Sequence, residues 1–358
     1  MDKINKNSFN ELTQIRNSKQ RMEDAKNQPK INQLLGYIWQ TNELHILFAD
    51  TGIGKSIIAV ASIDALTKGA RFLFLENENA PLTALYYDFE LSDRQFKKRY
   101  SNDYDQDHDF SHSFYIDTID FAELINMDPT ALFVDLLFER FKYDIEKTGT
   151  NILVIDNLTF LSTQSSQDTQ VALEVMRRLN ELKKQFNLSI LVLAHTPKRF
   201  SSAPITINDL AGSKHLSNFA DSVSAIGKST QGKNIRYWKQ IKPSRSGELI
   251  FDTGNVLILE IEKQDAFLTM KHKGFSSEWD HLKEETGNEE TPPPVFEVVE
   301  LLKQNLTYGE IAAKLGISKG TITKWKNRYP QLFVSVSTVS EGGGVGNGET
   351  WKQETIKI

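Results

Sequence analysis

Eight consecutive residues combine two glycines, a lysine and a serine at a spacing that can bind phosphate. They are Ala49, Asp50, Thr51, Gly52, Ile53, Gly54, Lys55 and Ser56. Their order follows the pattern G-x-x-x-x-G-K-S, with alanine in place of the first glycine. A strand-like apolar run precedes this loop and a helical pattern follows it. The order of strand, loop and helix predicts a polyphosphate site; a chance glycine turn is the alternative.

The residue types explain how this phosphate loop would bind its ligand. Gly52 and Gly54 allow positive-φ turns that aim backbone N–H groups inward, where the helix dipole adds its positive end. Lys55 supplies a positive charge for the β- and γ-phosphates, and the Ser56 hydroxyl is a hard oxygen ligand for Mg²⁺. We therefore expect the loop to bind ATP, with Mg²⁺ as the cofactor.

A buried apolar run at 151–155 ends in a carboxylate, Asp156. In a parallel sheet, a carboxylate at this position holds Mg²⁺ beside the phosphate loop, together with the serine hydroxyl and water. Many strands end in aspartate, so a simple strand-end cap is the alternative. The combination with the phosphate loop favours Asp156 and Ser56 as the metal ligands.

Glu90 lies just beyond another strand-like run. ATP hydrolysis needs a carboxylate that orients and deprotonates the attacking water, and a glutamate at the carboxyl edge of an adjacent strand can reach that water. The same residue could instead favour the N-terminus of a helix expected at 92–100. The residues alone support both interpretations equally.

Two further polar groups have open roles. His195 ends a third apolar run and could report loss of the γ-phosphate, although a lone strand-end histidine is more often a surface residue. Lys239, Lys242 and Arg245 lie in a hairpin-like basic segment that could equally be a solvated turn. Because no arginine lies beside the phosphate loop in the sequence, we expect a neighbouring subunit to complete the site.

The pattern between these motifs predicts how they are positioned. Strand-like runs alternate with helical ones, which is typical of an α/β fold with a mostly parallel sheet covered on both faces. The runs are 44–48, 84–89, 151–155, 189–194, 222–226 and 256–261. We expect a mobile N-terminal arm at 1–30, an ATPase domain at 31–275, an acidic and proline-closed linker at 276–294, a helix-turn-helix domain at 295–330 and a flexible tail at 331–358.

Residues 307–328 carry the second motif with a chemical role. Thr307 and Glu310 fit a capping box, and Gly316 fits a tight turn between two short helices. The second helix would bury Ile322 and Trp325. Its exposed face would carry Lys319, Thr321, Thr323, Lys324, Lys326 and Arg328. Such a face predicts phosphate and base contacts with duplex DNA; a small bundle for protein contacts is the alternative.

Composition excludes several classes of function. The 358 residues include no cysteine, which excludes disulfides, thiolate catalysis and cysteine-based zinc sites. The net charge of −5 restricts any nucleic-acid surface to a local patch. No apolar run reaches the length of a membrane span, and the first residues lack the apolar region of a signal peptide. We expect a cytoplasmic protein without a membrane partner.

The order of these motifs resembles that of RecA-like hexameric ATPases, especially plasmid RepA-type helicases and, more distantly, replicative helicases and KaiC-like proteins. The resemblance covers roughly residues 31 to 262. It implies a RecA-like P-loop fold with Glu90 as catalytic base and His195 as sensor. It also implies that Lys242 or Arg245 reaches into a neighbour's ATP site. The C-terminal motif resembles helix-turn-helix domains of the sigma-region-4 and resolvase kind.

The resemblance implies a homo-hexameric ring that hydrolyses ATP between subunits. Such a ring would move along or unwind DNA, with single-stranded DNA in its channel, during replication or transfer of a plasmid or mobile element. The helix-turn-helix would bind duplex DNA. One alternative is an ATP-switched regulator or loader that does not unwind DNA. Another is a non-hydrolysing structural protein, against which the presence of Lys55, Ser56, Glu90 and Asp156 argues.

Overall fold

A computed structural model describes residues 15–158, 168–197, 199, 201–211, 213–245, 247–282, 293–328 and 333. Outside this range lie 1–14 of the predicted arm, 283–292 of the predicted linker and 334–358 of the predicted tail. The chain divides into two compact units, one made of most residues up to Leu282 and one made chiefly of those beyond it. Within the described residues, no helix is both long enough and apolar enough to cross a membrane.

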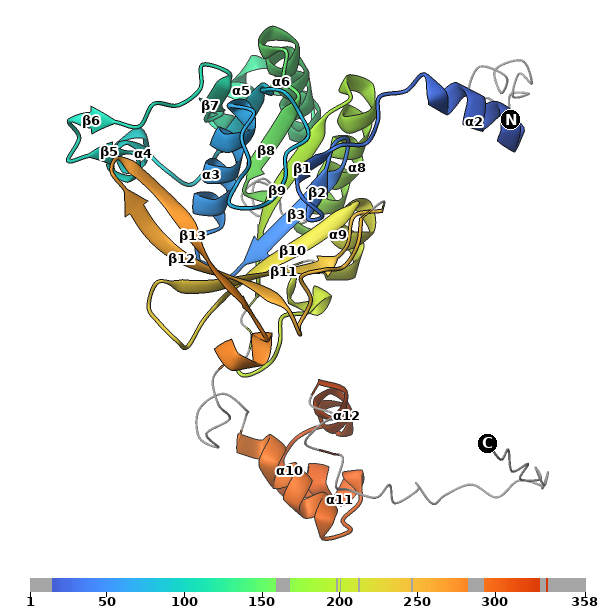
Figure 1. Ribbon diagram of the computed structural model, residues 1–358. Helices are drawn as coiled ribbons and strands as arrows, with labels where there is room; N and C mark the ends of the chain where they lie inside the picture. Colours follow the sequence, from blue (N-terminus) through green and yellow to red (C-terminus); the bar gives the residue numbers. More distant parts are fainter. Residues whose placement is uncertain are drawn as a thin grey trace, which may run out of the picture. The chain divides into compact units, whose positions relative to one another are not determined.

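A nine-stranded sheet forms the centre of the first unit (Figure 1). Its strand order is β13-β12-β11-β10-β3-β9-β8-β4-β7. The parallel strands are β3 (Leu44–Ala49), β4 (Ala84–Asp88), β7 (Phe114–Asp117), β8 (Ile152–Asp156), β9 (Ser189–His195) and β10 (Ser222–Lys228). An antiparallel extension follows β10 and contains β11 (Ile235–Lys242), β12 (Val256–Gln264) and β13 (Phe267–Ser276). The predicted α/β class with a mostly parallel sheet is confirmed.

Every apolar run identified in the sequence forms a strand of this sheet, as β3, β4, β8, β9, β10 and β12. The apolar pattern does not predict β7, β11 or β13. In β11 the reason is the presence of Arg236, Lys239 and Lys242 among the apolar residues. Arg236 and Lys239 are nevertheless buried. Strand β11 therefore has the composition of a solvent-exposed segment, although it is an inner strand of the sheet and its buried cations bond to other groups of the protein.

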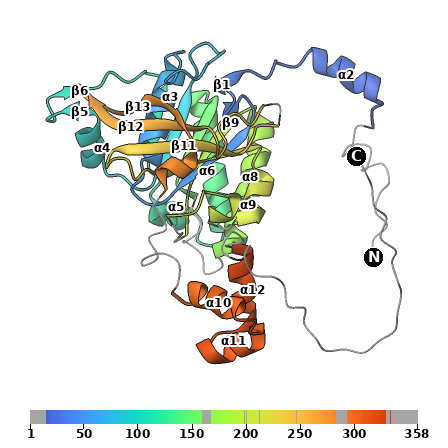
Figure 2. The ribbon, with the colours of Figure 1, turned by 60° about the horizontal axis from the view of Figure 1, so that its bottom comes forward.

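Helices cover both faces of the sheet (Figure 2). On one face, α3 (Lys55–Thr67) shares a hydrophobic cluster with Leu47 of β3. On the other face, α6 (Phe133–Thr148) and α8 (Asp168–Phe186) share a cluster with Phe48 of β3. Because successive side chains of a strand point to opposite faces, burial on both sides fixes the register of β3 and the position of the loop that follows it.

Shorter elements complete the first unit. The helices are α2 (Ser18–Lys26), α4 (Asp93–Arg99), α5 (Phe121–Met127), α9 (Ser213–Phe219) and the 3₁₀ turns η1 (Ile207–Asp209) and η2 (Glu278–His281). Two short antiparallel pairs are β1 (Gln33–Leu35) with β2 (Trp39–Gln40), and β5 (Ser101–Asn102) with β6 (Gln106–Asp107). Helix α2 lies within the predicted arm; Asn17 caps it, and none of its residues is buried.

The acidic stretch after β13 differs from the linker that we expected to begin at 276. Its residues up to 282 belong to the first unit, and Glu278 of η2 is fully buried. Glu278 forms an ion pair with Lys239 of β11 and accepts a hydrogen bond from the backbone N–H of Ile205 at 2.7 Å. A buried counter-charge thus accounts for an acidic residue that composition assigned to solvent.

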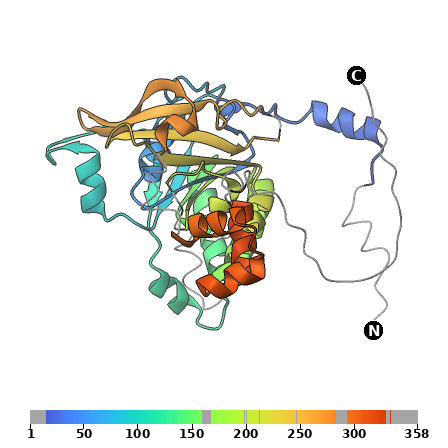
Figure 3. The same cartoon turned by 90° about the horizontal axis from the view of Figure 1, so that it is seen from below.

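The described part of the second unit contains three helices (orange to red in Figure 3). They are α10 (Pro293–Lys303), α11 (Tyr308–Leu315) and α12 (Lys319–Arg328). Their core includes Val298, Ile311 and Ile322. The predicted capping box of Thr307 is present at the start of α11, and Gly316 ends that helix with a φ of 64°. Prolines begin α10 rather than precede it, since the first helical turn needs no backbone donor there.

Candidate functional site: a nucleotide site at the strand ends

The phosphate loop joins β3 to α3 at the carboxyl edge of the parallel strands (Figure 1). Gly52 and Gly54 have φ angles of 73° and 116°, which glycine adopts without strain. A Cβ atom on Gly54 would also lie 2.5 Å from Cε of Met270 in β13. The turns predicted for both glycines are therefore present.

Ala49 stands where the pattern has its first glycine. It is the last residue of β3, is fully buried and pairs with His195 of β9 in parallel register. An extended strand residue needs no positive φ, so the fold accommodates a methyl side chain at this position.

The Lys55 ammonium lies between the loop backbone and β9. Its Nζ donates to the carbonyl oxygens of Ala49 at 3.2 Å and Asp50 at 3.4 Å, and to Nδ1 of His195 at 3.0 Å. Burial lowers the pKa of Lys55, and nearby carboxylates oppose that shift. A triphosphate would compete with two carbonyls and an imidazole for this ammonium.

Glu90, Asn157 and His195 follow or end three adjacent strands, β4, β8 and β9, and meet beside the loop. Nε2 of His195 lies 3.1 Å from Oε1 of Glu90, and Nδ2 of Asn157 donates to the same oxygen. Because an ammonium group can only donate, Nδ1 of His195 accepts from Lys55, and Nε2 lies 3.1 Å both from Oε1 of Glu90 and from Nδ2 of Asn157. A chain of contacts therefore links the Lys55 ammonium to the Glu90 carboxylate.

These contacts separate the two interpretations of Glu90. Hydrogen bonding by His195 lowers the pKa of Glu90 despite partial burial, so the carboxylate is ionised at neutral pH. Its backbone N–H donates to Oδ1 of Asp88 at 2.9 Å, which fixes the turn after β4. The helix N-terminus has its own cap, because Ser92 and Gln95 form the capping box of α4. The side chain of Glu90 thus serves the strand-end cluster rather than that helix.

Asp156 ends β8 and has the environment expected of a metal ligand. Its Oδ2 accepts a hydrogen bond from the Tyr86 hydroxyl at 2.7 Å. Its Oδ1 is buried without a hydrogen-bond partner among the described residues. Burial raises the pKa of Asp156 to about 6, although the hydroxyls of Ser56 and Tyr86 oppose the shift. A buried carboxylate oxygen with a serine hydroxyl nearby fits Mg²⁺, which takes one or two carboxylates and completes its shell with phosphates and water.

Asp156→Asn is expected to stabilise the protein in the absence of Mg²⁺ at pH 8. Because the folded state raises the pKa, it binds more protons than the unfolded state between about pH 4 and 6, and wild-type stability falls as pH rises through that window. The shift corresponds to at most about 3 kcal/mol above pH 6. Urea unfolding of both proteins at pH 8 and pH 4.5 measures the effect, which should be largest at pH 8. A less stable variant at pH 8 would contradict it.

Lys242 and Arg245 lie beside the start of β10, at the amino-terminal ends of the parallel strands, whereas the phosphate loop lies at their carboxyl ends. Nζ of Lys242 donates to the carbonyls of Ser217 at 3.0 Å and Ala220 at 2.6 Å. Arg245 forms an ion pair with Asp221 at 2.9 Å, and its side chain is 71% exposed. Neither cation contributes to the phosphate loop of its own chain.

Four residues of the site were not predicted from the sequence. Asn157 follows Asp156 directly, so its position after the apolar run was an available signal. Tyr86 and Asp88 carry polar groups inside β4, where only the contacts distinguish them from packing. Arg236 of β11 donates from Nε to the carbonyl of Ile53 at 2.7 Å. No arginine lies beside the phosphate loop in the sequence, but the sheet brings one there from a distant part of the chain.

The predicted DNA-binding residues lie on α12. Lys319, Thr323 and Lys324 are exposed, and Thr321 and Lys326 are half-buried. Two hydroxyls have local partners: that of Thr321 bonds with Ser318 at 2.9 Å, and that of Thr323 donates to the carbonyl of Lys319 at 3.2 Å. The side chain of Arg328 is outside the described residues.

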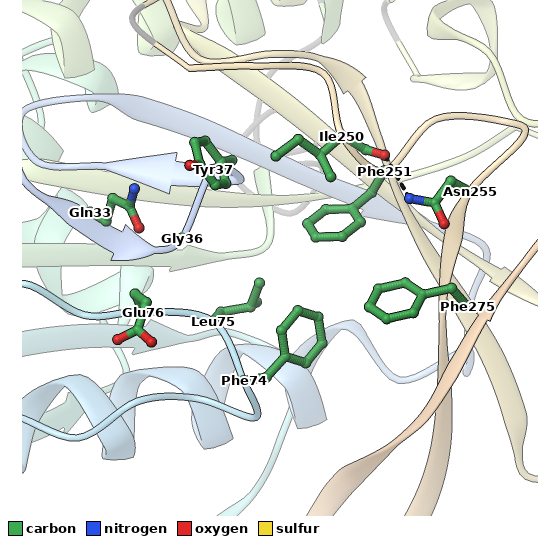
Figure 4. Close-up of a pocket in the computed structure, with 10 residues that line it drawn as sticks. All are labelled: Gln33, Gly36, Tyr37, Phe74, Leu75, Glu76, Ile250, Phe251, Asn255 and Phe275. Atoms are coloured by element: carbon green, nitrogen blue, oxygen red, sulfur yellow. Dashed lines mark hydrogen bonds between the residues drawn. The ribbon is translucent and has the colours of Figure 1, made fainter.

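A separate pocket of about 340 Å³ lies elsewhere on the first unit (Figure 4). Tyr37, Phe74, Phe251 and Phe275 are among its lining residues. Phe74 meets Phe275 edge to face, with ring centroids 5.5 Å apart. The lining includes no residue of the phosphate loop or of the strand-end cluster, so this pocket is not part of the nucleotide site.

Two family models match different parts of the chain. The model of a helix-turn-helix domain matches residues 297–331, which confirms the predicted class of the C-terminal helices. No curated protein matches the chain. Among solved structures, a KaiC-like protein from the archaeon Pyrococcus horikoshii OT3 has 13% identity and a TM-score of 0.44, and the match covers 67% of this chain and 99% of that one. The model of an AAA domain matches residues 11–200. Because that match spans more than half of the chain, the protein belongs to the AAA domain family.

Proposed function

We propose that this protein is an ATP-driven DNA motor, most simply a helicase, that works as a homo-hexameric ring in replication or transfer of a plasmid or mobile element. The observation that carries the proposal is the chain of contacts from Lys55 through His195 to Glu90, beside the phosphate loop. It joins a cation for the phosphates to an ionised carboxylate suited to water activation. A helix-turn-helix on the same chain supports DNA as the partner.

ATP would bind with its phosphates against the N–H groups of residues 52–56, and Lys55 would transfer its hydrogen bonds from the loop carbonyls to the β- and γ-phosphates. Ser56 and Asp156 would hold Mg²⁺, which neutralises charge on the phosphates when bound. The Oδ1 of Asp156, which is buried without a hydrogen-bond partner among the described residues, supports this assignment.

Glu90 would accept the proton of the attacking water. Asn157 and His195 hold its carboxylate in place and keep it ionised. His195 also contacts Lys55, so any movement of the ammonium toward the γ-phosphate changes the hydrogen bonding of the imidazole. This dual contact supports His195 as the sensor that reports hydrolysis to the rest of the subunit.

A neighbouring subunit would complete the charge at the γ-phosphate. The support is positional: Arg245 is exposed at the sheet edge opposite its own phosphate loop. In a head-to-tail ring, the face that carries Arg245 would have to meet the ATP site of the next subunit for Arg245 to reach it. Arg245 is the better candidate for the finger, because Lys242 already donates to two carbonyls and burial lowers its pKa.

The ring would pass single-stranded DNA, while α12 would bind duplex DNA and recruit the motor to it. Lys319, Lys324 and Lys326 would supply phosphate contacts, and Thr321 and Thr323 would approach base edges if their hydroxyls exchange their present partners. Such binding weakens as salt rises, because phosphate contacts release counterions.

DNA-stimulated ATP hydrolysis, measured alongside strand displacement, tests this function. We expect single-stranded DNA to raise ATPase activity and the wild-type chain to displace a labelled strand in an ATP-dependent manner. A chain with Lys319, Lys324 and Lys326 replaced by alanine should keep basal ATPase activity but lose most duplex affinity, with a salt slope smaller by about 3. Unchanged duplex binding in that variant would favour a protein-docking role for α10–α12.

The same assay distinguishes the second candidate function. An ATP-switched DNA-binding regulator or loader would hydrolyse ATP and bind duplex DNA through α12 but would displace no strand. The engagement of Arg245 with Asp221 within one chain is compatible with that candidate, because it needs no ring. ATPase activity without displacement on any fork or overhang would therefore select the regulator over the motor.

A further inference from the structure

Arg236 is a buried cation that lies against the phosphate loop. Only 7% of the residue is exposed. Its Nε donates to the carbonyl of Ile53 at 2.7 Å, and its Nη1 donates to the carbonyls of Lys233 at 2.9 Å and Ile235 at 2.8 Å. All three acceptors belong to the backbone. The planar guanidinium thus joins the antiparallel extension of the sheet to the loop that precedes α3.

We infer that Arg236 is a positioning residue of the ATP site, which holds the peptide between Ile53 and Gly54 in its phosphate-binding orientation and whose charge strengthens nucleotide binding. The inference rests on the proposed ATPase function, because the loop in question is the one that would bind ATP.

The geometry of a single peptide carries the first part of this inference. In a trans peptide, the carbonyl of one residue and the N–H of the next point in opposite directions. Arg236 holds the Ile53 carbonyl toward β11, so the N–H of Gly54 is directed away from β11, into the loop that receives the phosphates. This peptide rotates about ψ of Ile53 and φ of Gly54, and Gly54 has the positive φ that glycine adopts without strain. The hydrogen bond from Arg236 adds a restraint on the peptide at a position where glycine has no side chain to supply one.

The charge of Arg236 carries the second part. Burial lowers its pKa, and its hydrogen-bond acceptors among the described residues are backbone carbonyls rather than carboxylates. Lys239, on the same strand, differs because it has Glu278 as a buried ion-pair partner. A buried cation without a counter-charge is unfavourable. The polyphosphate held by the same loop is the anion that would compensate it, since attraction persists over several ångströms in a poorly hydrated interior.

A second contact from the extension supports the same role. Cε of Met270 on β13 occupies the space next to Gly54, where a Cβ atom would lie only 2.5 Å away, and Ile261 of β12 would be 3.5 Å from that atom. The outer side of the loop therefore has apolar support from two strands and polar support from β11. Met270 and Ile261 support the position of the loop, whereas Arg236 fixes the direction of one of its peptides.

Arg236→Met and Arg236→Lys separate the charge and the hydrogen bond from simple packing. We expect Arg236→Met to weaken equilibrium binding of ATP and of a fluorescent ADP analogue by about ten- to a hundredfold and to raise KM by a similar factor, while kcat at saturating ATP stays within about threefold. Arg236→Lys, which keeps the charge and one donor, should recover at least half of the loss on a logarithmic scale. Arg71→Met is the control, because Arg71 is an exposed arginine paired with Glu76; it should bind nucleotide like the wild type.

Each alternative outcome overturns the inference in a recognisable way. Affinity within twofold of the wild type in a folded Arg236→Met chain would remove Arg236 from the site. A loss of kcat with unchanged affinity would also remove it. The same conclusion would follow if the Arg236→Lys chain, shown to be folded by its urea unfolding curve, bound nucleotide no better than the Arg236→Met chain. If Arg236→Met does not fold, the lysine variant decides: it must fold and keep nucleotide affinity above that of the Lys55→Ala chain. Failure of the proposed function differs, because the wild-type chain itself would then bind no nucleotide.

Discussion

Glu90→Gln is expected to lower kcat for ATP hydrolysis by about a hundredfold or more while ATP affinity remains close to that of the wild type. Glutamine keeps the size and the hydrogen-bond acceptor of the side chain, so Asn157 and His195 retain a partner at the end of β4. It cannot accept the proton of the attacking water. Phosphate release at saturating ATP, together with direct measurement of ATP binding, checks both halves of this expectation.

Glu146→Gln provides the matched control for this substitution. Glu146 is an exposed residue near the end of α6 and has no part in the site, so its variant should hydrolyse ATP at the wild-type rate. Near-wild-type turnover in Glu90→Gln would remove Glu90 from the role of base. Loss of ATP binding in the same variant would instead show that the carboxylate supports the ground state rather than the reaction.

Arg245→Ala chains are expected to bind ATP but to be nearly inactive, and mixing them with Lys55→Ala chains should restore activity. Each variant retains what the other lacks, so an interface between an intact phosphate loop and an intact Arg245 is functional. In randomly mixed rings with equal amounts of the two chains, roughly a quarter of interfaces have this combination. ATPase activity measured as a function of mixing ratio should therefore peak near equal amounts, although each chain alone is nearly inactive.

Loss of the ion pair between Arg245 and Asp221 is a small perturbation of the fold, because Arg245 is largely exposed and the buried Asp221 keeps its ion pair with Lys183 and its hydrogen bond from the Leu44 N–H. Arg177→Ala is a suitable control: Arg177 is an exposed arginine that pairs with carboxylates on α8, and its loss should leave chains active on their own. Two results would refute the ring. One is the absence of any activity peak on mixing, and the other is monomers alone in light scattering with ATP, Mg²⁺ and DNA present.

The strand-end residues were predictable because chain order and sheet geometry agree there. Ala49, Asp156 and His195 end apolar runs that are buried on both faces, and such runs in an α/β pattern form parallel strands. Parallel strands end at one edge, so the polar residues that follow each run converge. The meeting of Lys55, Glu90 and His195 follows from that argument without knowledge of any contact.

The supporting residues were not predictable by the same reasoning. Arg236 and Lys239 sit in a strand whose charged side chains bond to carbonyls and to a buried carboxylate, and hydropathy assigns such residues to solvent. Burial of Glu278 is equally unpredictable, because the acidic sequence around it resembles that of a linker. Each of these assignments depends on a partner far away in the chain. No local pattern specifies that partner, and only the folded sheet brings the two together.

The parallel register has a consequence for how this protein should be assayed. Ala49 stands opposite His195, and Asp88 opposite Asp156, so the reacting groups are aligned by ladder pairs that lie between different strands. A strand that slipped by two residues would keep every apolar side chain on its proper face. The chain would stay compact, and its circular dichroism spectrum would still show the same helix and sheet content. The slip would nevertheless move one ligand by about 7 Å. Turnover per folded molecule is therefore a stricter measure of correct folding for this chain than circular dichroism or thermal melting.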